Sequence, residues 1–159
     1  MLSFDDIPTP VNTRYKTIPN IYGGLTWENG YILNTTWERV TYGWNGYATG
    51  KNSGIFVAFN GGGQPMSISV PAGQYFQLNS LYLSSAWNTD LTLIIQGTRG
   101  GVLYYQTTLQ LQVTIKTALY TLKWFGIDKI KFTAIGGTPY PGLQGSGTQF
   151  VLDDLDISI

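Results

Sequence analysis

The segment WERVTYGWNGYATGKN, residues 37–52, gathers aromatic and amide side chains among glycines. Aromatic rings offer flat faces on which the C–H faces of a pyranose pack, and neutral amides can hydrogen-bond to its hydroxyls. The segment therefore predicts a sugar-binding surface carried on a loop, with Trp44 as the leading stacking residue. Its aromatic members are Trp37, Tyr42, Trp44 and Tyr47, and its amide members are Asn45 and Asn52.

Two shorter segments supply second candidates for the same binding rim. The run AWNTD sets Trp87 beside Asn88 at a predicted strand end, and TPYPG holds Tyr140 between two prolines. We expect Trp44, Tyr47 and Tyr140 to be exposed, because they stand in glycine-rich or proline-rich stretches.

Glu28 and Glu38 raise an enzymatic alternative. A glycoside hydrolase needs two carboxyl groups that face each other across the scissile bond, one as acid and the other as nucleophile or base. The two glutamates lie in the aromatic-rich region, with Asp90 in reserve. A salt bridge from Glu38 to an Arg or Lys is the simpler explanation, and we expect no enzymatic activity.

Acidic residues are scarce, yet two pairs stand at the two ends of the chain. Asp5 and Asp6 lie in SFDDIP, and Asp153 and Asp154 lie in the closing FVLDDLDISI, followed by Asp156. Aspartate is depleted in strands because its short side chain competes for backbone hydrogen bonds. The presence of these aspartates in the closing strand therefore needs an explanation. They bind a metal ion, accept backbone N–H groups, or protect an edge strand by their charge.

Composition excludes several classes of function. Only 11% of the 159 residues are charged and the formal net charge is zero, so nucleic-acid binding is not expected. The absence of Cys and His excludes disulfides, thiol nucleophiles, Ser-His-Asp triads and the usual zinc or iron sites. The apolar runs are too short to span a membrane, and the opening MLSFDDIP is not a signal peptide.

Alternation of apolar and polar residues predicts strands over most of the chain after residue 53. The predicted strands are 54–60, 66–70, 76–83, 91–97, 102–113, 118–124, 129–135 and 150–159. No stretch shows a sustained helical stripe. We predict one domain over residues 1–159, an all-β antiparallel sandwich of jelly-roll type with almost no helix. Residues 8–53 are predicted to be long loops with short strands over one face or edge.

The chain resembles a family of secreted bacterial and fungal β-sandwich proteins. The residues that carry the resemblance are SFDDIP, IPNIYGGLTWENGYILN, VAFNGGGQPMSIS, FQLNSLYLSSAW, LIIQGTRGGVLYY and FVLDDLDISI. Most of this family has no assigned activity, so the resemblance implies a fold and secretion more than a function. The sequon Asn34-Thr35-Thr36 is compatible with secretion. A cytoplasmic location stays open.

The closing pattern of an aromatic residue, an apolar residue and two aspartates also resembles the last strand of jelly-roll carbohydrate-binding modules. In those modules an acid from the first strand and one from the last share a structural calcium ion. The matching positions here are Asp5 or Asp6 and Asp153 or Asp154. First and last strands commonly lie side by side in a jelly roll, and Ca²⁺ would relieve the repulsion between clustered carboxylates.

These observations predict a non-catalytic, lectin-like carbohydrate-binding module that recognises a glycan or polysaccharide. The alternative is an extracellular structural, adhesion or host-interaction protein whose aromatic residues bind a partner protein. A small glycoside hydrolase using Glu28 and Glu38 is the minor alternative.

Overall fold

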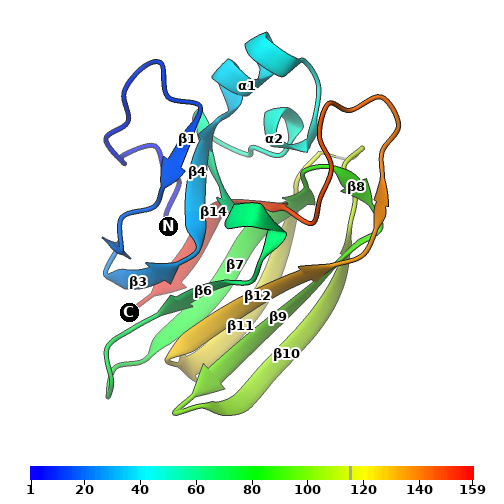
Figure 1. Ribbon diagram of the computed structural model, residues 1–159. Coiled ribbons are helices and arrows are strands. Elements are labelled where there is room, and N and C mark those ends of the chain that lie inside the picture. The colour runs from blue at the N-terminus through cyan, green and yellow to red at the C-terminus, as the bar shows by residue number, and fades with distance from the viewer. Residues whose placement is uncertain (115) are drawn as a thin grey trace.

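The computed structural model describes residues 1–114 and 116–159, and these residues form two six-stranded sheets packed face to face (Figure 1). The first sheet has the order β1 (Tyr15–Thr17), β4 (Gly30–Asn34), β5 (Phe56–Asn60), β14 (Phe150–Ser158), β7 (Phe76–Ser85) and β11 (Ala118–Ile127). The second has the order β10 (Val102–Leu111), β9 (Leu91–Arg99), β12 (Lys129–Ile135), β6 (Met66–Ser69), β3 (Leu25–Glu28) and β2 (Ile21–Tyr22). A separate pair joins β13 (Thr138–Pro139) to β8 (Asn88–Thr89). The strand pairings are antiparallel, so the predicted all-β antiparallel sandwich is confirmed.

Alternation along the strands creates the core between the sheets. On β9, Leu91, Leu93 and Ile95 are fully buried while the residues between them are partly exposed. They belong to one buried cluster together with Leu83 of β7 and Phe132 of β12. Burying a side chain of this size stabilises the fold by about 2 kcal/mol. The alternation of apolar and polar residues therefore predicted these strands correctly.

The prediction of loops over residues 37–52 is wrong for two short helices. Helix α1 (Thr35–Tyr42) begins after Asn34, whose side chain accepts a hydrogen bond of 2.9 Å from the Trp37 N–H, and it ends at Gly43, where φ is 78°. Helix α2 (Gly46–Thr49) begins after Asn45, whose side-chain oxygen accepts from the Ala48 N–H. Asparagine caps explain where both helices begin, and Gly43 explains where α1 ends. No helix in the described ranges is long and apolar enough to cross a membrane.

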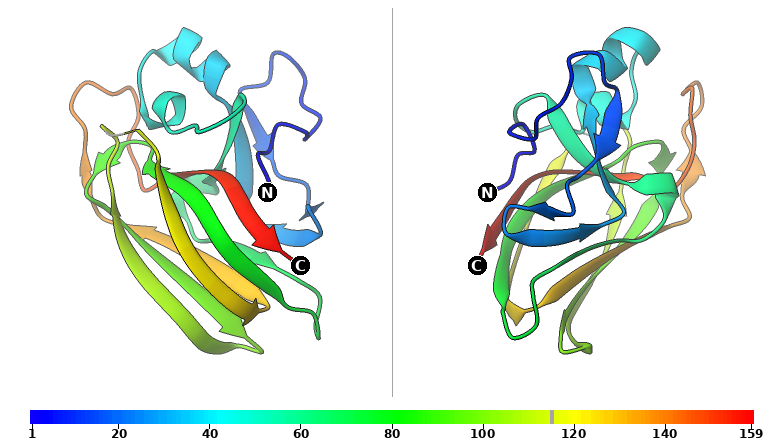
Figure 2. Two further views of the ribbon diagram at one scale, coloured as in Figure 1. Left: turned by 180° about the vertical axis from the view of Figure 1, so that it is seen from behind. Right: turned by 60° about the vertical axis from the view of Figure 1, so that its left-hand side comes forward.

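The two ends of the chain meet, as the sequence predicted. Leu2 and Leu155 exchange two backbone hydrogen bonds of 2.8 and 3.0 Å, and Figure 2 shows the two termini on the same side of the molecule. Strand β14 lies inside the first sheet, between β5 and β7. Asp153 and Asp154 are buried and therefore do not protect a sheet edge, whereas Asp156 is partly exposed.

Strand β14 also departs from simple alternation. Its register with β7 shifts between Asp153 and Asp156, and Asp154 has a positive φ of 43°. Leu155 consequently joins the main core, whereas Val151 belongs to a second buried cluster. Simple alternation would place these two apolar residues on one face, and the irregularity at Asp154 separates them.

The terminal acids hold the segment that leads from α2 to β5, residues 52–56. Asp153 accepts backbone N–H bonds of 2.7 and 3.0 Å from Asn52 and Ser53. Asp154 accepts from the side chains of the same two residues, at 2.7 and 2.8 Å. Asp5 accepts from the N–H groups of Ile55 and Phe56, at 2.7 and 3.2 Å. The alternative in which these acids accept backbone N–H groups therefore describes Asp153 and Asp5, whereas Asp154 accepts from side chains.

Asp153 should make stability depend on pH. Burial raises the pKa of Asp153 from its usual value of 3.8 to about 6, against the opposing effect of its N–H donors. The folded state then binds the proton more tightly than the unfolded state. Stability from this group is present below about pH 4 and is lost as the pH rises to about 6.

We predict that the free energy of unfolding of the wild type falls relative to that of Asp153→Asn between pH 4 and pH 6, by on the order of 1–2 kcal/mol. The amide cannot ionise, so the variant lacks this dependence. Urea denaturation across this pH range measures the difference, which should be constant above and below the window. Parallel curves throughout would contradict the assignment.

Candidate functional site

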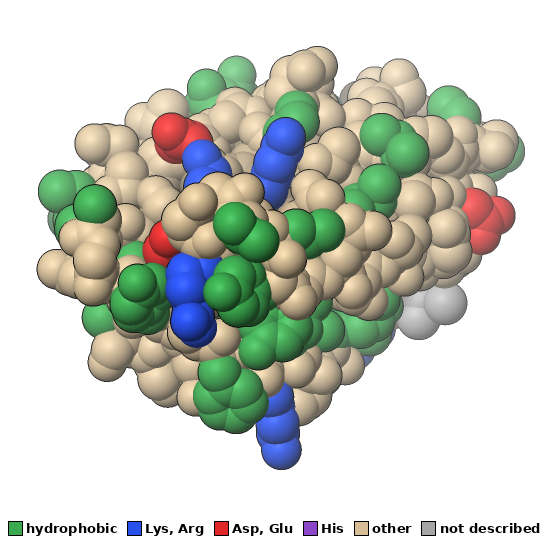
Figure 3. Space-filling model, turned by 90° about the horizontal axis from the view of Figure 1, so that it is seen from below, with side chains coloured by type: hydrophobic (Ala, Val, Ile, Leu, Met, Phe, Trp, Pro, Cys, Tyr) green, Lys and Arg blue, Asp and Glu red, His purple; other side chains and the backbone are tan. Residues whose placement is uncertain are grey.

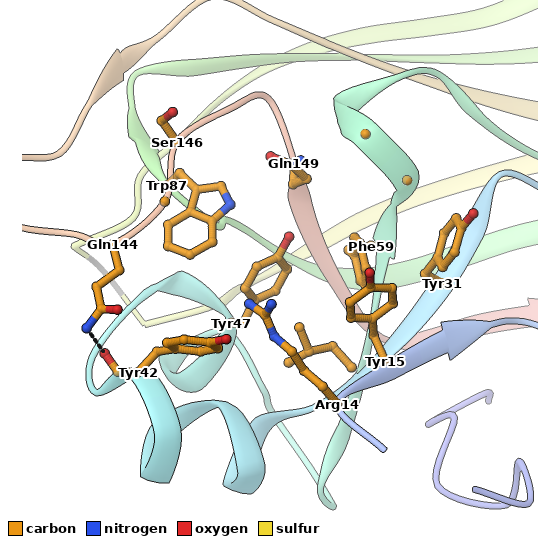
Figure 4. Close-up of a pocket in the computed structure, with 14 residues that line it drawn as sticks. Arg14, Tyr15, Tyr31, Tyr42, Tyr47, Phe59, Trp87, Gln144, Ser146 and Gln149 are labelled. Carbon is orange, nitrogen blue, oxygen red and sulfur yellow. Dashed lines mark hydrogen bonds between the residues drawn. The ribbon is translucent and has the colours of Figure 1, made fainter. Parts of the chain in front are cut away.

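A pocket of about 540 Å³ opens at the end of the sandwich that carries the helices (Figure 4). Its walls are mostly aromatic rings and neutral polar groups, brought together from segments far apart in the sequence. The lining residues are Arg14, Tyr15, Tyr31, Leu33, Tyr42, Tyr47, Phe59, Gly61, Gly62, Trp87, Gln144, Gly145, Ser146 and Gln149.

The buried carboxylate of Glu38 on α1 lies behind the pocket wall and holds residues of that wall in place. Arg14 donates to both oxygens of Glu38, through Nε at 2.7 Å and Nη2 at 3.0 Å. Asn45 donates a third hydrogen bond of 2.9 Å from Nδ2. Glu38 has no exposed surface, so its charge depends on these partners. The carboxylate thereby fixes Arg14 and the start of α2 relative to α1.

Arg14 forms part of the pocket wall. Its guanidinium lies 4.5 Å from the centre of the Tyr42 ring and 5.8 Å from that of Tyr15, and Figure 4 shows it between these two rings. The hydrogen bond to Glu38 raises the pKa of Arg14, against the effect of burial. The cation is therefore permanent, and Glu38 neutralises its charge locally.

Helix α2 places Tyr47 at the floor of the pocket. The Gly46 N–H donates to the Ala86 carbonyl at 2.9 Å, and a Cβ at Gly46 would lie 1.9 Å from the Ser85 carbonyl oxygen. Only glycine allows this close approach. Tyr47 then meets Trp87 edge to face, with ring centres 5.5 Å apart. Burial raises the pKa of Tyr47, so its hydroxyl stays neutral.

The segment from residue 144 to residue 149 closes the remaining side with amides. Gln144 donates from Nε2 to the Tyr42 carbonyl at 3.5 Å, the contact drawn as a dashed line in Figure 4. The side-chain oxygen of Gln149 is buried and has no hydrogen-bond partner within the described residues. An unpaired buried acceptor is costly, and a ligand that donates a hydrogen bond would satisfy it.

The structure brings together three of the residues predicted to bind a ligand. Tyr42, Tyr47 and Trp87 line the pocket. Trp44 and Tyr140 lie outside it and contact each other, with ring centres 5.4 Å apart. Trp44 is 42% exposed, as expected, but Tyr140 is only partly exposed, because it packs against Trp44. Tyr47 is only 3% exposed, because α2 packs it against Trp87.

Three other predicted residues do not line the pocket. Trp37 packs on the far side of Tyr42, with ring centres 5.9 Å apart, and lines a separate hollow. Asn45 is buried by its cap and its bond to Glu38. Asn88 is also buried, and its Nδ2 donates to the Gly136 carbonyl.

Sequence reasoning missed the residues that complete the walls. Tyr15 and Tyr31 belong to the aromatic-rich first third, and only their position on adjoining strands β1 and β4 reveals that they face one pocket. Gln144 and Gln149 follow Tyr140 in a glycine-rich stretch, and the sequence gives no sign that these amides meet the aromatic residues of the first third. Arg14 carried no signal, because its partner Glu38 lies 24 residues away.

The two glutamates do not form a catalytic pair in the pocket, since neither lines it. Glu28 lies on β3, where it accepts from Lys129 and from the hydroxyl of Ser67. Glu38 is buried in its salt bridge with Arg14, which confirms the simpler explanation for this residue. Asp90 accepts from the Gln112 amide.

The predicted calcium ligands lie in the same region but already have protein donors. Asp5, Asp153 and Asp154 accept from residues 52–56, and Asp6 accepts from the Tyr22 hydroxyl at 2.6 Å. Within the described part of the chain, no three acidic side chains are grouped as a metal would require. The calcium site stays a prediction, which melting curves with and without a chelator can test.

No protein-family model matches the chain, and no curated protein matches it. Among solved structures, one match is the structure of TmCBM61 in complex with β-1,4-galactotriose, with 10% sequence identity and a TM-score of 0.41. The alignment covers 86% of this chain and 88% of that chain. Similarity this low shows neither a family nor a ligand, so the two resemblances seen in the sequence stay hypotheses.

We predict that Arg14→Met lowers the free energy of unfolding by about 2–3 kcal/mol, because it leaves the Glu38 carboxylate buried without its cation. The matched control is Lys129→Met, which breaks the exposed pair between Lys129 and Glu28. That change should cost less than about 1 kcal/mol. Chemical denaturation of both variants measures the contrast, and equal losses would contradict the central role of Glu38.

Proposed function

We propose that this protein is a non-catalytic, lectin-like module that binds a neutral glycan in the aromatic pocket. The observation that carries the proposal is the lining itself. Six aromatic side chains, three neutral amide or hydroxyl side chains and a charge-neutralised arginine surround a cavity of about 540 Å³. This volume lies within the range of small-ligand sites.

The lining residues can contact both the apolar C–H groups and the polar hydroxyls of a sugar. The rings of Tyr15 and Tyr42 can pack against C–H groups, and the unpartnered Gln149 oxygen can accept a hydrogen bond from a hydroxyl. Arg14 lines the pocket, but its charge is balanced by Glu38. A neutral hydroxylated ligand therefore suits the site better than an anionic one.

The pair of exposed Trp44 and partly exposed Tyr140 provides a second stacking surface outside the pocket. Trp44 lies between Tyr42 and Tyr47 in the sequence, and both of these line the pocket. Further units of an oligosaccharide could reach this pair. The placement of Glu28 and Glu38 outside the pocket supports binding without hydrolysis.

The opposite end of the sandwich supplies a matched control for the aromatic residues. Figure 3 shows apolar side chains gathered there among lysine and arginine side chains. At that end Tyr104 is 52% exposed and its ring centre lies 4.8 Å from Arg99, much as Tyr42 packs on Arg14.

We predict that Tyr15→Ala and Tyr42→Ala each weaken glycan binding by roughly five-fold to thirty-fold, since a lost stacking ring costs about 1–2 kcal/mol. Tyr104→Ala should leave binding unchanged. A glycan array identifies a ligand for the wild type, and calorimetry with that ligand measures the variants. Melting temperatures confirm that all three remain folded.

Two results would contradict the proposal that a glycan binds in the pocket. If Trp44→Ala removes binding while Tyr15→Ala and Tyr42→Ala do not, the site is the pair of Trp44 and Tyr140 rather than the pocket. If the wild type binds no glycan on the array, the interpretation as a protein that binds a partner protein takes its place.

A further inference from the structure

The two sheets have four edges, and three of them are protected against pairing with another strand. Strands β1 and β2 are only three and two residues long. Strand β11 is longer, but its register is interrupted twice and Lys123 within it has a positive φ of 53°. Short strands, irregularities and edge lysines are the usual means by which proteins prevent edge-to-edge association.

Strand β10 has none of these protections over most of its length. It runs for ten residues, and from Val102 to Val113 the sequence contains no charged residue and no proline. Its one register shift lies near the start, so the pairing with β9 is regular from Tyr105 to Leu111. Within the described residues, β9 is its one neighbour in the sheet. Figure 1 shows β10 at the outer margin of the sandwich.

We propose that β10 pairs with β10 of a second copy of this chain, antiparallel, with Thr108 on the two-fold axis. The regular stretch from Tyr105 to Leu111 is centred on Thr108, so it can pair with itself over its whole length. An isologous contact requires such self-complementarity. In this register Thr108 faces its own copy, and threonine pairs across strands are favourable.

The side chains fit this register on both faces of the sheet. On the exposed face, Gln106 lies opposite Gln110 of the second copy, and amides both donate and accept. Gln106 and Gln110 already bond along the sheet to Gln96 and Thr92, so pairing would extend this polar ladder. On the inner face, Tyr105, which stacks on Trp124 at 5.3 Å, would lie opposite Leu111 of the second copy.

A second copy is the fitting occupant because the edge carries no charge. Identical charges would face each other across a two-fold axis and repel, which would favour a different partner with complementary charge. The neutral amide and hydroxyl row of β10 is compatible with itself. The inference is independent of any ligand in the aromatic pocket, since no residue of β10 lines it.

Sedimentation velocity of the wild type over a wide range of concentrations tests the proposal, and a reversible dimer is expected. Thr108→Lys places two like charges at the axis and should weaken dimerisation by roughly five-fold or more. The matched control is Thr121→Lys, an exposed threonine on the other long edge strand, β11, and it should dimerise like the wild type.

A mixture of the Thr108→Lys and Thr108→Asp proteins should form heterodimers, because opposite charges then meet at the axis. This rescue shows pairing at Thr108 itself rather than a general loss of folding. A wild type that stays monomeric at every concentration would overturn the proposal. So would a dimer that Thr108→Lys leaves unchanged, because the contact would then lie elsewhere.

Discussion

The buried carboxylate of Glu38 is the interaction on which the candidate site depends. It has no exposed surface and takes hydrogen bonds from Arg14, which precedes β1, and from Asn45, which caps α2. A buried charge without partners is strongly unfavourable, so the three groups are ordered together. Through them the carboxylate fixes α1, α2 and the first strand relative to one another. Tyr15, Tyr42 and Tyr47 reach the same pocket as a result.

The same pair also sets the chemical character of the pocket. Arg14 is the single charged residue among its lining residues, and Glu38 lies directly behind it. An anionic ligand would therefore meet a cation that is already neutralised, with the Glu38 carboxylate close by. Recognition has to come from ring faces and from neutral donors and acceptors such as the Gln149 oxygen. This agrees with a sequence in which only 11% of residues are charged.

Local sequence patterns were sufficient to predict the sandwich, whereas the pocket depends on residues that only the fold brings together. Alternation shows which face of β9 or β12 is buried, because the period of two is a local property. Two aromatic residues of the 37–52 segment, Tyr42 and Tyr47, line the pocket, whereas Trp37 and Trp44 do not. Asn34 and Asn45 begin helices there that the sequence analysis did not predict. Arg14 and Gln149 could not be found, because Arg14 pairs with Glu38, 24 residues away, and Gln149 meets the other lining residues only in the folded chain. Helix capping also explains why Asn45 is buried rather than available to a ligand.

The position of β14 has a consequence for how the molecule is assembled. The last strand of the chain lies in the interior of the first sheet, between β5 and β7, and its acids hold the segment before β5. During synthesis, therefore, the first sheet remains split into two parts, each with an open edge, until β14 has left the ribosome. Its closure relies on contacts between residues about a hundred positions apart, which slows folding. A chain stopped before residue 150 would expose two strand edges that are prone to aggregate.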